Sequence, residues 1–130
     1  MRNILVAVMV TGLMACTGPD FELNNKINKV FSDIDTIHEG VVHFNTLNKG
    51  MDCPSISRLF DDGFINSNTN EYGSLKNSRD IYELKKDEAG GCRLIARDLG
   101  EKVCEQIKGN IPSDYLSECK GNGTLQLWVH

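Results

Sequence analysis

The sequence has no apolar run long enough to cross a membrane as a helix, which takes about 20 consecutive residues. It also has no surplus of positive charge, because 14 Lys and Arg stand against 18 Asp and Glu and leave a formal net charge of −4. Proteins that bind a nucleic-acid backbone cluster their lysines and arginines, so the sequence argues against nucleic acid as a partner. Its 130 residues suit a single domain of ordinary globular composition, 40% apolar and 25% charged.

The common catalytic motifs are absent as well. There is no Gly-x-Ser-x-Gly elbow for a nucleophilic serine and no glycine-rich loop before a helix to hold phosphates. Two pairs of adjacent acids, Asp61-Asp62 and Asp87-Glu88, fall where a helix end and a turn are expected, and acids there are usually solvated. General acid–base catalysis needs groups that converge in a cleft. We therefore expect no catalytic residues and no cofactor; a small cell-wall hydrolase is the weaker, enzymatic alternative.

A metal site is equally poorly supported. His38 and His43 look at first like the histidine pair of a zinc-protease motif, but that motif places its histidines four residues apart on one helical face. At a spacing of five residues the second ring is turned by about 140° from the first, so the two cannot share a metal on a regular helix. Histidines that are solvated or packed at an edge are the better interpretation, and the sequence predicts no metal ligand.

Residues 1–15 have the features of a secretory signal peptide. Arg2 gives a basic start, an apolar stretch of about a dozen residues follows from Ile4, and a small residue precedes Cys16. The apolar stretch is too short to span a bilayer. We therefore expect the first fifteen residues to act as an export signal that is removed from the mature protein.

Residues 13–16, Leu-Met-Ala-Cys, resemble the lipobox of bacterial lipoproteins. The resemblance implies that Cys16 is lipidated and becomes the mature N-terminus. It also implies, through Thr17 in place of Asp, an outer-membrane protein that faces the periplasm or the cell surface. Residues 16–22 would then form a polar tether. The alternative is a plain signal peptide that is cut nearby and leaves Cys16 as a spare thiol.

Four further cysteines remain: Cys53, Cys92, Cys104 and Cys119. An even number in an exported chain predicts two disulfides, which persist in an oxidising compartment such as the periplasm. Four cysteines allow three pairings, and the sequence alone does not choose among them. A zinc site is the competing interpretation, but the chain has no Cys-x-x-Cys pair and no closely spaced histidines to complete it.

The apolar pattern predicts an α+β fold, with a long N-terminal helix packed on a small antiparallel sheet in one domain over residues 23–130. Apolar residues recur at alternating spacings of four and three, which predicts a helix over about 22–48: Leu23, Ile27, Val30, Ile34, Ile37, Val41 and Phe44. Further along we expect a short helix over 55–62, a surface loop over 66–78, strands at 81–84, 92–97 and 125–130, and a helix capped by Asp98 and closed by Gly109. We expect Trp128 to act as a lid over the core rather than as a partner anchor.

Three stretches resemble type IVb pilins and related pilin-like subunits. Residues 24–50 resemble the soluble half of the pilin helix, residues 56–65 the segment that follows it, and residues 92–104 a strand that leads into a short Cys-bearing helix. The resemblance implies that Cys104 pairs with Cys119, which leaves Cys53 to pair with Cys92. The chain departs from pilins at its N-terminus, where a lipobox-like signal replaces the prepilin cleavage site and its long apolar segment.

These features predict a non-enzymatic lipoprotein that works through protein–protein contact, as an accessory or adaptor in a type IV pilus or secretion assembly. Its partner would be a protein, and its membrane contact would be the lipid on Cys16. We expect the contact surface at a sheet edge and in the Asn66–Ser78 loop. The alternative of a different class is a periplasmic inhibitor or immunity-type lipoprotein that blocks an enzyme or toxin with a protruding loop.

Overall fold

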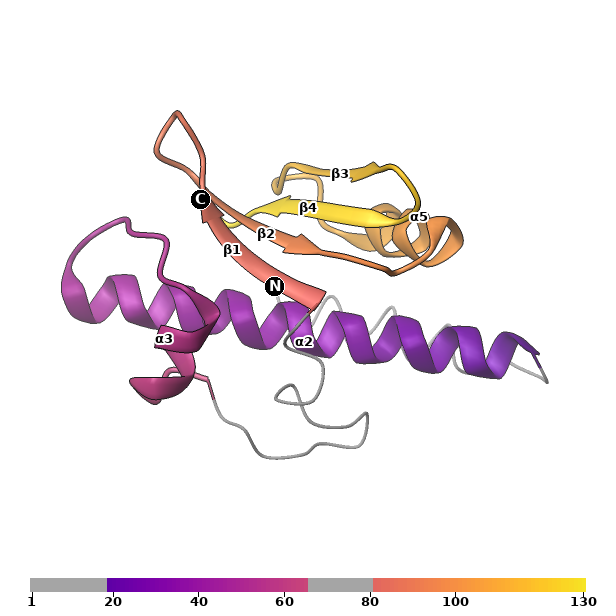
Figure 1. Cartoon of the computed structure of the whole chain (residues 1–130), viewed down its shortest axis with the longest axis horizontal. Helices are drawn as coiled ribbons and strands as arrows, with labels where there is room; N and C mark the ends of the chain where they lie inside the picture. Colours follow the sequence, from indigo (N-terminus) through magenta and orange to yellow (C-terminus); the bar gives the residue numbers. More distant parts are fainter. Residues whose placement is uncertain (1–18, 66–80) are drawn as a thin grey trace.

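The computed structural model describes residues 19–65 and 81–130, with side chains from Phe21 onward. The predicted signal peptide, Cys16 and the loop over residues 66–78 lie outside the described residues. The described elements follow in the order α2 (Pro19–Asn48), α3 (Ile56–Asp61), β1 (Tyr82–Lys86), β2 (Cys92–Ala96), α5 (Glu101–Asn110), β3 (Ser117–Lys120) and β4 (Thr124–Trp128). The predicted α+β class, a long N-terminal helix packed on a small antiparallel sheet, is confirmed (Figure 1).

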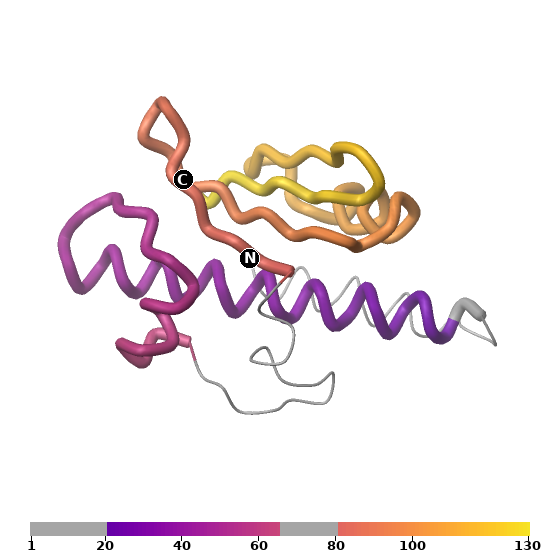
Figure 2. The backbone as a smooth tube through the Cα atoms, in the orientation of Figure 1, coloured from indigo at the N-terminus to yellow at the C-terminus, as the bar shows by residue number. Residues whose placement is uncertain are grey.

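Helix α2 runs along the length of the molecule, and the sheet lies over one side of it (Figure 2). It begins at Pro19, three residues before the predicted start at residue 22, so the last part of the predicted tether is helical. Proline suits the first turn of a helix because the backbone N–H it lacks would have no partner there. The C-terminal end at Asn48 agrees with the prediction.

The apolar stripe of α2 faces the core as predicted. Six of its seven residues are less than 10% exposed, and Leu23 packs against their edge. The buried face is wider than the stripe, however, because Phe31, Asn28, Asp33 and Asp35 are also less than 10% exposed. Other elements of the fold pack on both sides of the apolar stripe. They cover polar side chains that would be exposed to water on a helix buried along one face only.

The sheet has the strand order β1-β2-β4-β3, and every neighbouring pair is antiparallel. Strand β3 was not predicted, since Ser117-Glu118-Cys119-Lys120 has no run of apolar residues to mark it. Ile95 and Gln126 alternate away from the core, yet each is only 8% exposed, because long side chains from neighbouring strands cover that outer face. Arg93, for example, donates from Nη1 to Gln126 Oε1 over 2.8 Å.

The prediction that Asp98 caps α5 is wrong. Asp98 takes a left-handed backbone conformation with φ of 59°, and the N-cap is Gly100 with φ of 85°, which makes no side-chain capping bond. Helix α5 ends at Asn110 rather than at Gly109. The turn before β4 comes so close to Gly100 that a Cβ on Gly123 would collide with the Gly100 backbone. Close packing of two backbones therefore replaces side-chain capping here.

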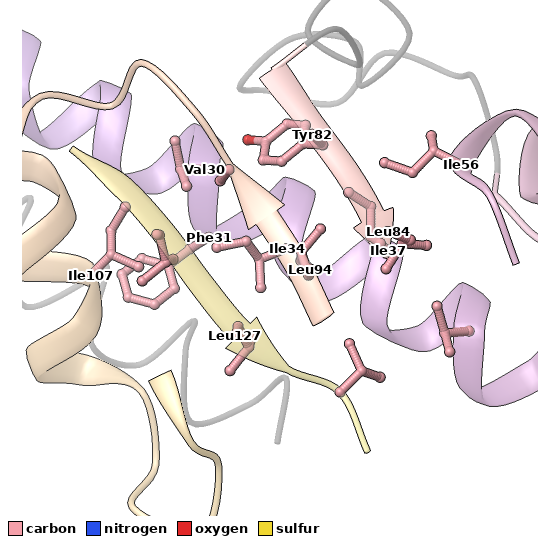
Figure 3. Packing of buried hydrophobic residues seen from close by; sticks show 14 of the residues in the cluster. Val30, Phe31, Ile34, Ile37, Ile56, Tyr82, Leu84, Leu94, Ile107 and Leu127 are labelled. Atoms are coloured by element: carbon pink, nitrogen blue, oxygen red, sulfur yellow. The ribbon is translucent and has the colours of Figure 1, made fainter. Parts of the chain in front are cut away.

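The core lies between α2, the inner face of the sheet and α5. Figure 3 shows Phe31 of α2 beside Ile107 of α5 and Leu127 of β4, so one cluster joins all three layers. At the other end, α3 and its tail pack onto α2 at Gly40, where a Cβ would lie 2.9 Å from Ile65 Cγ1. Glycine at position 40 is thus required by the close approach of the chain after α3.

Two disulfides join elements of the fold that lie far apart in the sequence. Cys53 pairs with Cys92 and joins the segment after α2 to the start of β2, and Cys104 pairs with Cys119 and joins α5 to β3. This is the pairing that the pilin resemblance implied. Cys92 and Cys104 are fully buried, so both bridges are part of the core.

Removing either disulfide should destabilise the fold, and the longer loop should cost more. The Cys53–Cys92 bridge spans 39 residues and the Cys104–Cys119 bridge spans 15. On the chain-entropy model these loops correspond to about 4 and about 3 kcal/mol of the free energy of unfolding. Urea unfolding of Cys53→Ala/Cys92→Ala and Cys104→Ala/Cys119→Ala, each against the wild type, measures both losses. A larger loss for the Cys104–Cys119 pair would contradict this ranking.

Candidate interaction surfaces

The most perturbed titratable group among the described residues belongs to a buried cluster between α2 and β1. Tyr82 donates from Oη to Asp33 Oδ2 over 2.7 Å, and Lys29 Nζ lies 2.5 and 2.7 Å from the two oxygens of the same carboxylate. Burial, and then the charge of Asp33, raise the pKa of Tyr82 far above its ordinary value. Asp33 and Tyr82 are 2% and 5% exposed, too little to meet a substrate, so the cluster fixes β1 on α2.

The histidines and the paired acids take ordinary structural positions. His38 is half-buried and meets the edge of Tyr115 at 5.6 Å between ring centroids, and burial lowers its pKa. His43 is exposed. Across residues 19–65 and 81–130, no three His, Cys, Asp or Glu side chains gather as metal ligands would. Within the same ranges, no helix has the length and apolar content to cross a membrane.

Asp87 organises the hairpin between β1 and β2. Its carboxylate accepts from the Gly91 backbone N–H over 2.7 Å and from Trp128 Nε1 over 3.1 Å. These donors, the Gly91 N–H first, hold the pKa of Asp87 below its usual value. Trp128 is half-buried on the outer face of the sheet, with the Arg93 guanidinium 5.8 Å from its ring centre. It is therefore not the lid over the core that the sequence suggested, and it presents an aromatic surface to solvent.

A groove of about 440 Å³ opens at the C-terminal end of α2. It is lined by Val41, Val42, Asn45, Thr46, Lys49, Gly50, Met51, Val129 and His130. Val42 and Met51 leave 45% and 66% of their surface exposed, so the groove has an apolar wall open to solvent. This groove was not predicted from the sequence. The signal for it is that Val42 and Met51 are apolar but lie outside the predicted stripe.

The shape of the groove is fixed by one side-chain amide. Asn45 donates from Nδ2 to the Asp52 carbonyl over 3.0 Å and accepts from the Asp52 N–H over 2.7 Å. His130 Nε2 lies 3.0 Å from the same carbonyl oxygen. These bonds hold the segment after α2 back against the helix end and against the end of the chain that follows β4. The groove is thus preformed, as small binding sites in proteins usually are.

The two edges of the sheet differ. Strand β1 lies beside α3, whereas β3 is the end strand on the other side and carries Glu118 and Lys120 on its outer face. Their side chains form an exposed ion pair at 3.1 Å. The contact surface at a sheet edge stays a prediction, and the predicted Asn66–Ser78 contact loop lies outside the described residues.

No protein-family model, no curated protein and no solved structure matches the chain.

Replacing Tyr82 by Phe should cost about 1–2 kcal/mol of stability at neutral pH, because Asp33 loses a buried donor. It should also change the alkaline limb of the stability curve. A folded-state pKa above the unfolded value of 10.0 means that the unfolded chain loses the proton first, so stability is complete below pH 10 and falls above it. Tyr82→Phe should reduce this fall, by up to about 1.4 kcal/mol per pH unit.

Urea unfolding between pH 8 and 11.5, on the wild type, Tyr82→Phe and the control Tyr115→Phe, makes the comparison. The control should keep the alkaline loss of the wild type. An alkaline loss of equal slope in Tyr82→Phe would show that another group is responsible.

Proposed function

We propose that this chain is a non-enzymatic lipoprotein, held at a membrane by a lipid on Cys16, that acts by protein–protein contact as an accessory or adaptor in a type IV pilus or secretion assembly. The observation that carries the proposal is the layout of the described fold: a long helix packed on an antiparallel sheet, with the Cys104–Cys119 disulfide joining α5 to the end strand β3. The α+β layout agrees with the coarse fold that the sequence resemblance to pilins implied, and this agreement supports the proposal.

The chemistry of the surface agrees with a contact protein. Tyr82 of β1, whose pKa is strongly raised, is buried against α2, and no three His, Cys, Asp or Glu side chains gather within the described ranges. Among the described residues, two features suit a contact: a preformed apolar groove, and β3 as an end strand of the sheet. These features support an action through shape and apolar contact with a partner.

The groove fits one class of contact best. Its apolar wall takes an aliphatic or aromatic side chain, and Lys49 lines the same groove, which favours an acidic residue beside that side chain. We therefore assign the groove to an apolar residue flanked by a carboxylate on the partner protein.

The lipid anchor is tested by labelled palmitate and intact mass, with the wild type and Cys16→Ser expressed in a Gram-negative host. Labelled, membrane-bound protein is expected from the wild type, and loss of the label is expected from Cys16→Ser. Because the substitution removes only the acceptor thiol, the fold should be unchanged by near-ultraviolet circular dichroism. An unlabelled periplasmic species from the wild type would contradict the lipid anchor. The protein would then be a soluble exported factor.

The groove is tested by charge substitution on one helix. Val42→Glu should reduce the recovery of pilus or secretion components that co-purify with the tethered chain by about tenfold or more, since it places a like charge against an acidic partner and blocks the apolar wall. Leu47→Glu is the matched control, because Leu47 is 73% exposed on the same helix and does not line the groove. Equal recovery from both variants would exclude the groove as the contact.

A further inference from the structure

The free edge of β3 has a defined hydrogen-bonding pattern. The Trp128 N–H donates to the Leu116 carbonyl over 3.0 Å, which marks Leu116 and Trp128 as a hydrogen-bonded position of the β3–β4 ladder. The register then places Glu118 opposite Gln126 and Lys120 opposite Thr124. Because hydrogen-bonded and non-hydrogen-bonded pairs alternate along an antiparallel ladder, the backbone groups of Glu118 and Lys120 point toward β4. Those of Ser117 and Cys119 point away from the sheet.

Those outward-pointing groups are a template for another strand. Strand β3 carries no proline and pairs residue for residue with β4, so it lacks two of the devices that commonly protect an edge. Its short length of four residues and its charged side chains are the protection that remains. Glu118 and Lys120 lie two residues apart and therefore project from the same face of the strand, where 41% and 60% of their side-chain surfaces are exposed.

The order of these two charges along β3 favours one register of pairing with a second β3 strand. Two β3 strands can pair antiparallel only if the outward-pointing N–H and C=O groups of one strand face those of the other. The possible registers are therefore offset from one another in steps of two residues. A register that sets Glu118 opposite Glu118 repels, and so does one that sets Lys120 opposite Lys120. The register centred on Cys119 sets Glu118 opposite Lys120 twice. It places both ion pairs at non-hydrogen-bonded positions, where side chains across an antiparallel pair are closest.

We propose that β3 is a homotypic docking edge, at which two copies of this chain pair their β3 strands antiparallel about a two-fold axis through Cys119 and join their sheets into one. The Cys119 side chain does not obstruct the pairing, because the disulfide to Cys104 holds it toward α5. The interface is isologous and closes as a dimer, as two-fold contacts do. This inference is independent of the proposed function, since it uses only the geometry and charge of β3.

Sedimentation equilibrium of the full chain, with its disulfides formed and in density-matched detergent, tests the proposal. The wild type should reach a reversible monomer–dimer equilibrium. Glu118→Lys sets lysines opposite lysines, and Lys120→Glu sets glutamates opposite glutamates, so each should weaken dimerisation by about tenfold or more. The double variant Glu118→Lys/Lys120→Glu restores complementary pairs and should dimerise like the wild type.

Mixing the two single variants separates pairing between copies from the ion pair within one copy. An equimolar mixture of Glu118→Lys and Lys120→Glu should form heterodimers with about the affinity of the wild type, because each variant supplies the charges that the other lacks. The ion pair within one chain cannot be repaired by a second chain. Lys85→Glu on β1 is the control, with the same change of charge at the opposite edge of the sheet, and should leave dimerisation unchanged.

Since both charges are exposed, the single substitutions should change the free energy of unfolding little, which urea unfolding verifies. A wild type that stays monomeric up to millimolar concentration would overturn the proposal. So would a dimer whose affinity does not respond to the charge substitutions, or single variants that do not recover on mixing.

Discussion

The whole structure depends on burying one face of the 30-residue helix α2. A helix in water is marginally stable by itself, and α2 gains its stability from the apolar contacts that cover it. The sheet that does so is small, with strands of four or five residues, and it covers α2 only with the help of α3 and α5. Both disulfides join parts of that cover. One ties the segment after α2 to β2, and the other ties α5 to the end strand β3.

The elements that could be predicted are those with a strong period. The stripe from Leu23 to Phe44 gave the long helix and its C-terminal end, and the alternation after Cys92 gave a strand, because both patterns reflect a single buried face. Strand β3 was not predicted because its pairing with β4 and its disulfide keep it in place. Neither interaction produces an apolar pattern in the sequence. The burial of Asp33 was not predicted for a related reason. Its partners Tyr82 and Lys29 become visible only when β1 is placed against α2.

The candidate surfaces divide in the same way. The four core cysteines were recognised from their number, but their pairing came from a resemblance to pilins and needed the fold to place it. The groove depends on Asn45, whose amide bridges to the backbone of Asp52, and a polar residue late in a helix gives no such signal in the sequence. The outward position of Trp128 depends on the phase of β4. That phase follows from the burial of Leu125 and Leu127 on the opposite face.

Because each layer covers the other, α2 and the sheet should unfold as one cooperative unit, and native-state hydrogen exchange measures whether they do. The backbone amides of Ile34 and Ile37 in α2 and of Leu94 and Leu127 in the sheet should exchange with the same free energy, equal to that of global unfolding, because each layer is stable only with the other in place. Exchange of the α2 amides at a clearly lower free energy than the sheet amides, or their protection after the sheet has unfolded, would contradict it.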